Sequence, residues 1–185
     1  RGLGDVYKRQ SPDCFMPLMT GCVPKERKER LLQLLKDENK FWGEYMIPSI
    51  AKDDPAFPQQ HYWRGQIWPP QTLWTYLALK RAGEEELAWE LACKAAGMLS
   101  KEWNRNGYCP ENYSGITGEC SGAYHYNWGM LMGLPLLEEL IEFREDKVIF
   151  GNVMAPDGTE LKNIPVDGQL YDCLLYTSNA ADDLT

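Results

Sequence analysis

Two long segments rich in aromatic residues, glycine and proline separate stretches of helical pattern, and this alternation constrains the fold most. The segments cover residues 41–69 and 104–127. Loops of this length inside a compact domain are generally functional or disordered, and their density of tryptophan and tyrosine argues against disorder. The alternation is typical of an α-toroid, in which the loops at one end of the helices form the active site.

The first two helices are predicted from the spacing of apolar residues. One covers residues 25–39, after an entry marked by Pro24. The next begins at Pro70, runs to Lys80 or Arg81 and is closed by Gly83. Their apolar stripes are expected at Leu31, Leu32, Leu34 and Leu35 in the first helix, and at Leu73, Trp74, Leu77 and Ala78 in the second.

Two further helices are predicted over residues 84–102 and 128–143, the latter with a kink at Pro135. The tight turn at Gly83 implies that the helices on either side of it pack antiparallel. Their inward residues are expected to be Leu87, Leu91, Ala95 and Met98 in the third helix, and Leu131, Leu134, Leu137 and Ile141 in the fourth.

A short β-structure is expected after the helices. Val148, Ile149 and Phe150 form a strand-like run, and Asp157-Gly158 is a hairpin signal. We therefore expect residues 11–146 to form the helical region and residues 147–172 to form a β-tail that packs on it.

The two ends of the sequence are expected to be foreign to the protein. Back-translation of residues 1–10, RGLGDVYKRQ, gives a transposase sequencing adapter, and CLLYTS at the start of residues 173–185 gives its complement. Residues 11–172 are then a native segment cut at both ends. The compartment and the oligomeric state are left open.

Composition excludes several classes of function. A net charge of −8 disfavours nucleic acid, whose phosphates require a basic face. No apolar run approaches the roughly 20 residues of a membrane span. The six cysteines lack C-x-x-C spacing, and two histidines, His61 and His125, do not support a multi-histidine metal site. No metal and no cofactor are expected.

The first group of candidate binding residues is Tyr62, Trp63, Arg64, Gly65 and Trp68. Tryptophan offers a flat apolar face for a pyranose ring and an N–H donor for a hydroxyl. Arginine offers a rigid fork of donors, and glycine lets the backbone approach a ligand closely. The same spacing also fits a tryptophan–arginine stack within a core.

The second group surrounds Glu111, which follows a proline in a polar loop. Asn112 and Tyr113 are expected to orient its carboxylate, and Glu119 is a rival carboxylate in the same loop. A third group, at a helix start, contains His125 and Trp128. His125 fits either a contact to a sugar hydroxyl or a packed histidine.

The order of four segments resembles the C-terminal part of glycoside hydrolase family 63 and related barrels. These segments are FWGEYMIPSIAKDDPAF, HYWRGQIWPPQTLWTYLALKRAG, CPENYSGITGE and YNWGMLMGLPLLEELIEF. The related barrels include processing α-glucosidases, mannosylglycerate-hydrolase-like proteins and, more distantly, trehalases. The resemblance runs from residue 11 to 143 and implies an all-α chain, the last third of an (α/α)6 toroid with a short β-hairpin tail.

The resemblance also implies residue roles. Glu111 would be the catalytic base of an inverting glycosidase, and Trp63, Arg64 and Trp68 would contact an oligosaccharide or small glycoside. The general acid of the family is an Asp from an earlier part of the barrel, and Asp53 and Asp54 lie in the wrong segment to replace it. The remaining expected contacts are Tyr62, Gly65, Tyr113, His125 and Trp128.

Three other readings stay open at this point. A carbohydrate-binding toroid without a competent acid would keep the tryptophans and lack activity. A polysaccharide lyase on a similar toroid would use Tyr62, His125 and Arg64 as base and charge-neutralising group. A plain helical scaffold would leave the two aromatic loops unexplained.

Overall fold

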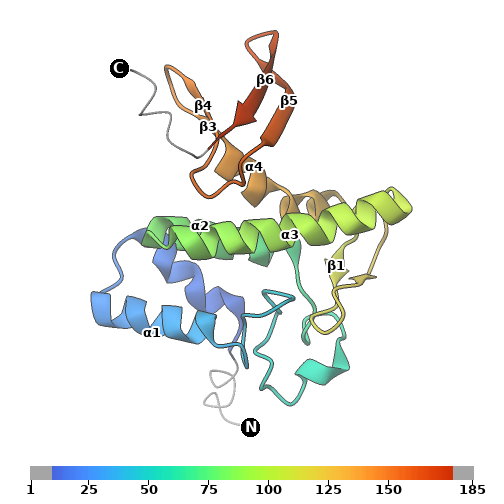
Figure 1. The fold of residues 1–185 in the computed structure, drawn as a ribbon. Helices are drawn as coiled ribbons and strands as arrows, with labels where there is room; N and C mark the ends of the chain where they lie inside the picture. The colour runs from blue at the N-terminus through green and yellow to red at the C-terminus, as the bar shows by residue number, and fades with distance from the viewer. Residues whose placement is uncertain (1–9, 177–185) are drawn as a thin grey trace. The chain divides into compact units, whose positions relative to one another are not determined.

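The computed structural model describes residues 10–176, which fall into two compact units, the first ending in sequence at Pro135 and the second beginning at Leu136. The first unit holds the long helices α1, α2 and α3 and both aromatic loops (Figure 1). Its elements are η2 (Pro12–Thr20), α1 (Lys25–Lys36), η3 (Phe57–Gln59), α2 (Pro69–Ala82), α3 (Glu85–Asn106), β1 (Asn112–Tyr113), β2 (Cys120–Ser121) and η4 (Asn127–Met132).

Helix α2 is the centre of this unit, because η2, α3 and η4 all pack against it. It runs antiparallel to α3, as the short turn between them predicts (Figure 1). Gly83 ends α2 at φ +74° and donates its N–H to the carbonyls of Leu79 and Lys80. Gly107 ends α3 in the same way at φ +71°, so α3 reaches Asn106 instead of stopping at residue 102.

The predicted apolar stripe of α2 is wrong in part. Trp74 is 40% exposed, and Leu73 and Leu77 are half-buried. The buried face instead includes Thr72 and Thr75, whose hydroxyls donate to the carbonyls one turn earlier in the helix. These bonds remove the penalty for burying the hydroxyls, so a polar face can pack inward. The buried residues of the helix are Pro69, Gln71, Thr72, Thr75, Tyr76, Ala78 and Leu79.

The other two helices of this unit follow their predicted patterns more closely. In α1, which ends at Lys36 instead of residue 39, Leu32 and Leu35 are buried, and Leu31 and Leu34 are half-buried. In α3, the predicted row is buried from Leu91 onward, and Leu87 is half-buried.

The single fourth helix predicted over residues 128–143 is also wrong. The chain forms the 3₁₀ segment η4, passes Gly133, forms the short helix α4 (Leu134–Leu140) and continues as strand β3 (Ile141–Phe143). Pro135 has no N–H to continue the helical bonding of η4, so the helix restarts there. Met132 and Leu140 are buried, whereas Leu137 is 54% exposed.

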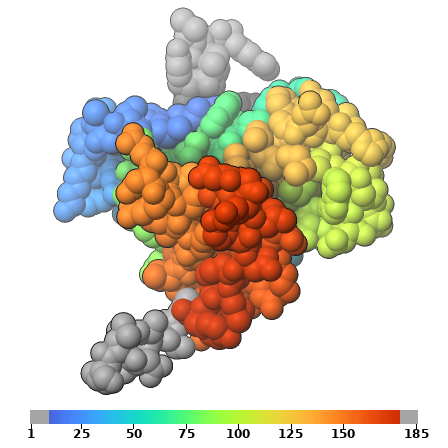
Figure 2. Space-filling view, turned by 90° about the horizontal axis from the view of Figure 1, so that it is seen from above, coloured from blue at the N-terminus to red at the C-terminus, as the bar shows by residue number. Residues whose placement is uncertain are grey.

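The second unit contains two antiparallel pairs of strands. Strand β3 pairs with β4 (Val148–Phe150), which confirms the predicted strand, and β5 (Thr159–Val166) pairs with β6 (Gln169–Leu175). The hairpin turn is Asp167-Gly168, with φ +48° and +79°, and Asp157-Gly158 instead precedes β5. In Figure 2 the β5–β6 hairpin lies beside residues 141–157, consistent with the ring contact between Phe150 and Tyr171.

The domain boundaries predicted from the sequence stay predictions. Strand β6 continues past residue 172, and Cys173 lies opposite Leu161 in the hairpin. The predicted adapter residues 1–9 and 177–185 lie outside the described residues. Across residues 10–176, the helices are all too short or too polar to cross a bilayer.

Candidate active site

The two aromatic loops meet through their backbones. Ile67 and Tyr113 exchange two hydrogen bonds, with N–O distances of 2.8 and 3.0 Å. Gly115 lies so close to the carbonyl oxygen of Gly65 that a side chain at Gly115 would clash with it. The Gln66 amide also donates to the Ser121 hydroxyl at 2.7 Å. These contacts bring the tryptophan segment next to the segment that carries Glu111.

Gly65 makes a close approach, but to protein. At φ +103° it is buried, and a Cβ there would lie 2.6 Å from the carbonyl oxygen of Phe57 and would clash with the Gln60 side chain. Gln60 in turn accepts a hydrogen bond from the Gly115 N–H at 2.7 Å. Gly65 therefore sets the path of the first loop against η3.

Four aromatic rings pack against one another in a cluster, here called the aromatic wall: Tyr62, Trp63, Trp68 and Trp128. Tyr126 contacts the Trp128 end of this cluster, with ring centroids 4.9 Å apart. Trp68 is its centre and is fully buried, with Trp63 stacked on it at 3.9 Å between ring centroids and 15° between planes. Tyr62 and Trp128 contact Trp68 edge-on at 4.7 and 5.8 Å. Trp63 remains 47% exposed, so its outer face is available to a flat apolar ligand.

The backbone of the first loop holds the wall in place. Tyr62 is 49% exposed and adopts φ +54°, a conformation that is rare for residues other than glycine. Its carbonyl accepts a hydrogen bond from the Trp68 indole at 3.3 Å. The buried indole N–H is thus satisfied, and the strained backbone directs Tyr62 and Trp63 outward.

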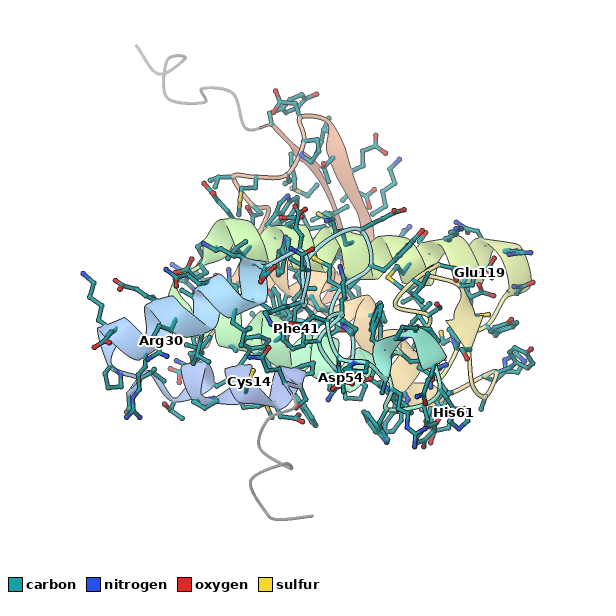
Figure 3. All side chains as sticks on the ribbon, turned by 90° about the horizontal axis from the view of Figure 1, so that it is seen from below. Cys14, Arg30, Phe41, Asp54, His61 and Glu119 are labelled. Carbon is teal, nitrogen blue, oxygen red and sulfur yellow. The ribbon has the colours of Figure 1, made fainter. Side chains whose placement is uncertain are left out.

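Arg64 is exposed beside the wall, and its guanidinium donates to the Gln59 side chain at 2.7 Å. Among the described residues, no carboxylate forms a salt bridge with it. The remaining donors are therefore available to a ligand. His61, whose carbonyl accepts from the Arg64 N–H, lies with Glu119 at the end of this unit opposite Arg30 (Figure 3).

Glu111 is half-buried and is held by three hydrogen bonds. Its carboxylate accepts from the Ala123 N–H at 3.0 Å, and its own N–H donates to the Ala123 carbonyl at 2.9 Å. Its carbonyl accepts from the Trp128 indole at 3.2 Å. Trp128 therefore connects Glu111 directly to the aromatic wall.

The residues expected to orient Glu111 do not do so. Asn112 and Tyr113 are fully buried, and neither the Asn112 amide nor the Tyr113 hydroxyl has a hydrogen-bond partner within residues 10–176. The Tyr113 ring packs with Ile67, Ala95, Met98 and Met132, and burial raises its pKa. The Tyr113 side chain points into the core, and the contact that orients the Glu111 carboxylate comes from the Ala123 N–H.

His125 belongs to a second aromatic cluster. Its ring contacts Tyr108 at 5.6 Å, and Tyr108 contacts Tyr124 at 4.8 Å. His125 is exposed at φ +55°, so it projects from the loop that also supplies Ala123. Among the described residues, the ring contact of His125 is with Tyr108, whereas the next residue, Tyr126, contacts Trp128 of the aromatic wall at 4.9 Å.

The rival carboxylates are placed differently from Glu111. Asp53 pairs with Lys40 at 2.5 Å, and Asp54 accepts from the Ala56 N–H at 2.8 Å, so both serve local structure. Glu119 is exposed near the tip of the β1–β2 hairpin. In the part of the chain described, no cluster of three or more metal-binding side chains occurs.

A match to a known family accompanies this geometry. Residues 4–129 match the sequence model of the mannosylglycerate hydrolase MGH1-like glycoside hydrolase domain. The chain belongs to this family. Its helical part is a partial (α/α)6 toroid, which confirms the fold class predicted from the sequence.

Curated relatives of this MGH1-like domain are similar over about the same stretch. Identity is 29% over 134 residues to a mannosyl-oligosaccharide glucosidase of Saccharomyces cerevisiae, covering 63% of this chain and 16% of that protein. It is 28% over 123 residues to the mannosylglycerate hydrolase of Thermus thermophilus, covering 65% and 28%. It is 32% over 119 residues to the glucosylglycerate hydrolase of Mycolicibacterium hassiacum, covering 62% and 25%.

A solved structure shows the same fold. The crystal structure of a GH63 mannosylglycerate hydrolase from Thermus thermophilus in complex with glucose aligns with a TM-score of 0.59 at 24% identity. The alignment covers 70% of this chain and 31% of that one. The MGH1-like chain therefore spans less than a third of the length of these relatives.

Sequence reasoning missed two residues that lie next to Glu111 or to the ends of its loop. Gly122 adopts φ +75°, and a Cβ there would lie 2.6 Å from the Glu111 carboxylate. Glu102, at the end of α3, is buried at 6% exposure. Gly122 gave a local signal as a glycine in a polar loop, and Glu102 continues the buried row of α3 that includes Ala95 and Met98.

Proposed function

We propose that this chain is the base-bearing and sugar-binding part of an inverting α-glycoside hydrolase, with Glu111 as general base. The observation that carries the proposal is the position of Glu111. Its carboxylate is held by the Ala123 N–H at 3.0 Å, and its backbone is tied through Trp128 to the aromatic wall.

The proposed reaction needs two carboxyl groups in opposite protonation states. In an inverting glycosidase they stand roughly 6.5–9.5 Å apart, which leaves room for the attacking water. Ionised Glu111 would remove a proton from that water while an acid protonates the glycosidic oxygen. We propose that the acid comes from a part of the protein outside this chain, because Asp53 and Asp54 are engaged in local structure.

The exposed side chains of the first loop would hold the sugar. The outer face of Trp63 would receive the apolar face of a pyranose, and Tyr62 would border it. The free donors of Arg64 would bind hydroxyls or a carboxylate of the substrate. Trp68 and Tyr113 would act from beneath as supports, since both are fully buried.

The names of the relatives limit the class of substrate that we propose. They are hydrolases of mannosylglycerate and glucosylglycerate and a glucosidase of mannosyl-oligosaccharides. We therefore propose an α-linked glucose or a related hexose as the sugar that lies on the wall. An exposed Arg64 is compatible with a leaving group that carries a carboxylate.

The proposal is tested by comparing the chain with the complete protein. The chain should bind methyl α-glucoside or glucosylglycerate, detected by saturation-transfer NMR, without hydrolysing either. The complete protein should hydrolyse one of them and release the β-anomer first, as seen by NMR of the fresh product. Turnover by the isolated chain above that of its Glu111→Gln variant would overturn the division of roles. Binding without turnover by the complete protein would indicate a carbohydrate-binding toroid.

A further inference from the structure

A buried carboxylate that the proposed reaction does not use lies at the end of α3. Glu102 is 6% exposed, and the Asn106 side chain donates to it from one turn later in the helix. The Tyr108 hydroxyl and the Cys120 sulfur lie close to its carboxylate. Burial by itself raises the pKa of Glu102, but the Asn106 hydrogen bond and the neighbouring Cys120, Tyr108 and Arg105 outweigh burial and leave the pKa below its usual range. These neighbours therefore favour the ionised carboxylate.

The partners of Glu102 stand at the two ends of the loop that carries Glu111. Tyr108 precedes Glu111 by three residues, and Cys120 lies in β2 opposite Tyr113. The Tyr108 hydroxyl and the Cys120 sulfur are themselves 3.4 Å apart. One carboxylate on a rigid helix thus lies beside both the beginning and the end of the same loop.

The N–H group that holds the carboxylate of Glu111 belongs to a residue only three positions after Cys120. Cys120 is followed by Ser121, Gly122 and Ala123, and the Ala123 N–H donates to Glu111. The fit is tight at Gly122, where a Cβ would lie 2.9 Å from the Cβ of Glu111 and 2.6 Å from its carboxylate. A shift of β2 would therefore be passed directly to the hydrogen bond that orients Glu111.

We propose that Glu102 is a positioning residue: through Tyr108 and Cys120 it clamps the ends of the 108–120 loop and so keeps Glu111 against the Ala123 N–H. Glu102 acts through these residues and does not contact substrate. The catalytic meaning of the clamp rests on the proposed function. The clamp itself is testable without any substrate.

The test is amide hydrogen exchange on the ¹⁵N-labelled chain. In Glu102→Gln, exchange at Ala123 should be at least about tenfold faster than in the wild type. Exchange at Ile67, which is bonded to Tyr113 across the loops, should change by less than about twofold. Glu111→Ala gives the rate at Ala123 once its acceptor is removed. Glu90→Gln is the matched control, because Glu90 is a hydrogen-bonded carboxylate on α3 that accepts from Trp42, away from the loop.

Each outcome of the exchange experiment either supports or overturns the clamp. Unchanged exchange at Ala123 in Glu102→Gln overturns the clamp, and so does equal acceleration at Ala123 and Ile67, which would indicate general destabilisation. If Glu102→Gln does not fold, Tyr108→Phe removes one arm of the clamp and is judged by the same two amides. If no glycoside binds but Ala123 responds as expected, the proposed function fails and the clamp stands.

Discussion

Trp63 and Trp68 lie parallel at 3.9 Å, yet one is 47% exposed and the other has no exposed surface. The buried indole supports the exposed one from beneath and is itself anchored by a hydrogen bond to the Tyr62 carbonyl. The outer indole is therefore rigid before a ligand arrives, and little conformational entropy is lost when a sugar binds to it.

Removal of the outer indole should weaken glycoside binding without unfolding the protein. We expect Trp63→Ala to weaken glycoside binding by at least about tenfold, which corresponds to about 1.4 kcal/mol. Trp103→Ala is the matched control, because Trp103 is 53% exposed on α3 outside the aromatic wall. Ligand titration by NMR measures both. Equal weakening in the two variants would show that the wall is not the sugar site.

A methyl group at Gly122 should displace Glu111. Gly122→Ala is expected to lower the turnover number of the complete protein by at least about tenfold, since the new Cβ would lie 2.6 Å from the carboxylate. Gly83→Ala is the control: its φ of +74° matches the +75° of Gly122, but its surroundings are open. Both variants bear the backbone strain of roughly 1–2 kcal/mol. Similar turnover in the two variants would mean that Glu111 needs no fixed position.

The charge of Glu102 should appear in the pH dependence of stability. Because its pKa is lowered on folding, Glu102 stabilises the protein above the ordinary carboxyl pKa of about 4.3. That contribution is lost as the pH falls through the lower pKa of the folded state. Glu102→Gln should therefore flatten the acid limb of the stability profile, measured by urea unfolding between about pH 3 and 7.

Three titratable groups lie near Glu102 and lower its pKa: Tyr108, Cys120 and Arg105. Neither Tyr108 nor Cys120 titrates in the acid limb, because the pKa of each is raised above its ordinary value. Glu86→Gln, at the exposed first turn of α3, controls for the loss of one negative charge. An acid limb that is equally steep in Glu102→Gln and in the wild type would rule out an ionised Glu102 as a stabilising group.

Local signals were enough to predict much of the fold. Gly83 marked the end of α2 because a left-handed cap suits glycine, and the run of apolar residues in α3 gave its buried face. The prediction of a single fourth helix was wrong because the helical backbone hydrogen bonding is interrupted at Gly133 and Pro135. The predicted apolar stripe of α2 was wrong in part because backbone carbonyls accept hydrogen bonds from the buried hydroxyls of Thr72 and Thr75. A hydropathy pattern does not register such bonds.

The site divides in the same way. Tyr62, Trp63 and Arg64 are consecutive residues, so their combined binding groups could be recognised from the sequence. The hydrogen bond that holds the Glu111 carboxylate could not be recognised from the sequence. Its donor, the Ala123 N–H, is 12 residues away and is brought close only by the folding of the loop. The expected orienting role of Tyr113 failed because the pairing of Tyr113 with Ile67 across the loops turns its side chain into the core.

The turnover number of the complete protein with Glu111→Gln, on an α-glycoside that the wild type hydrolyses, tests the central claim most directly. We predict a fall of roughly 100- to 10,000-fold with little change in KM, because the amide cannot accept the proton of the attacking water. Glu119→Gln, in the same loop, should remain within a few-fold of the wild type. A Glu111→Gln variant that keeps wild-type turnover would contradict the assignment of the base.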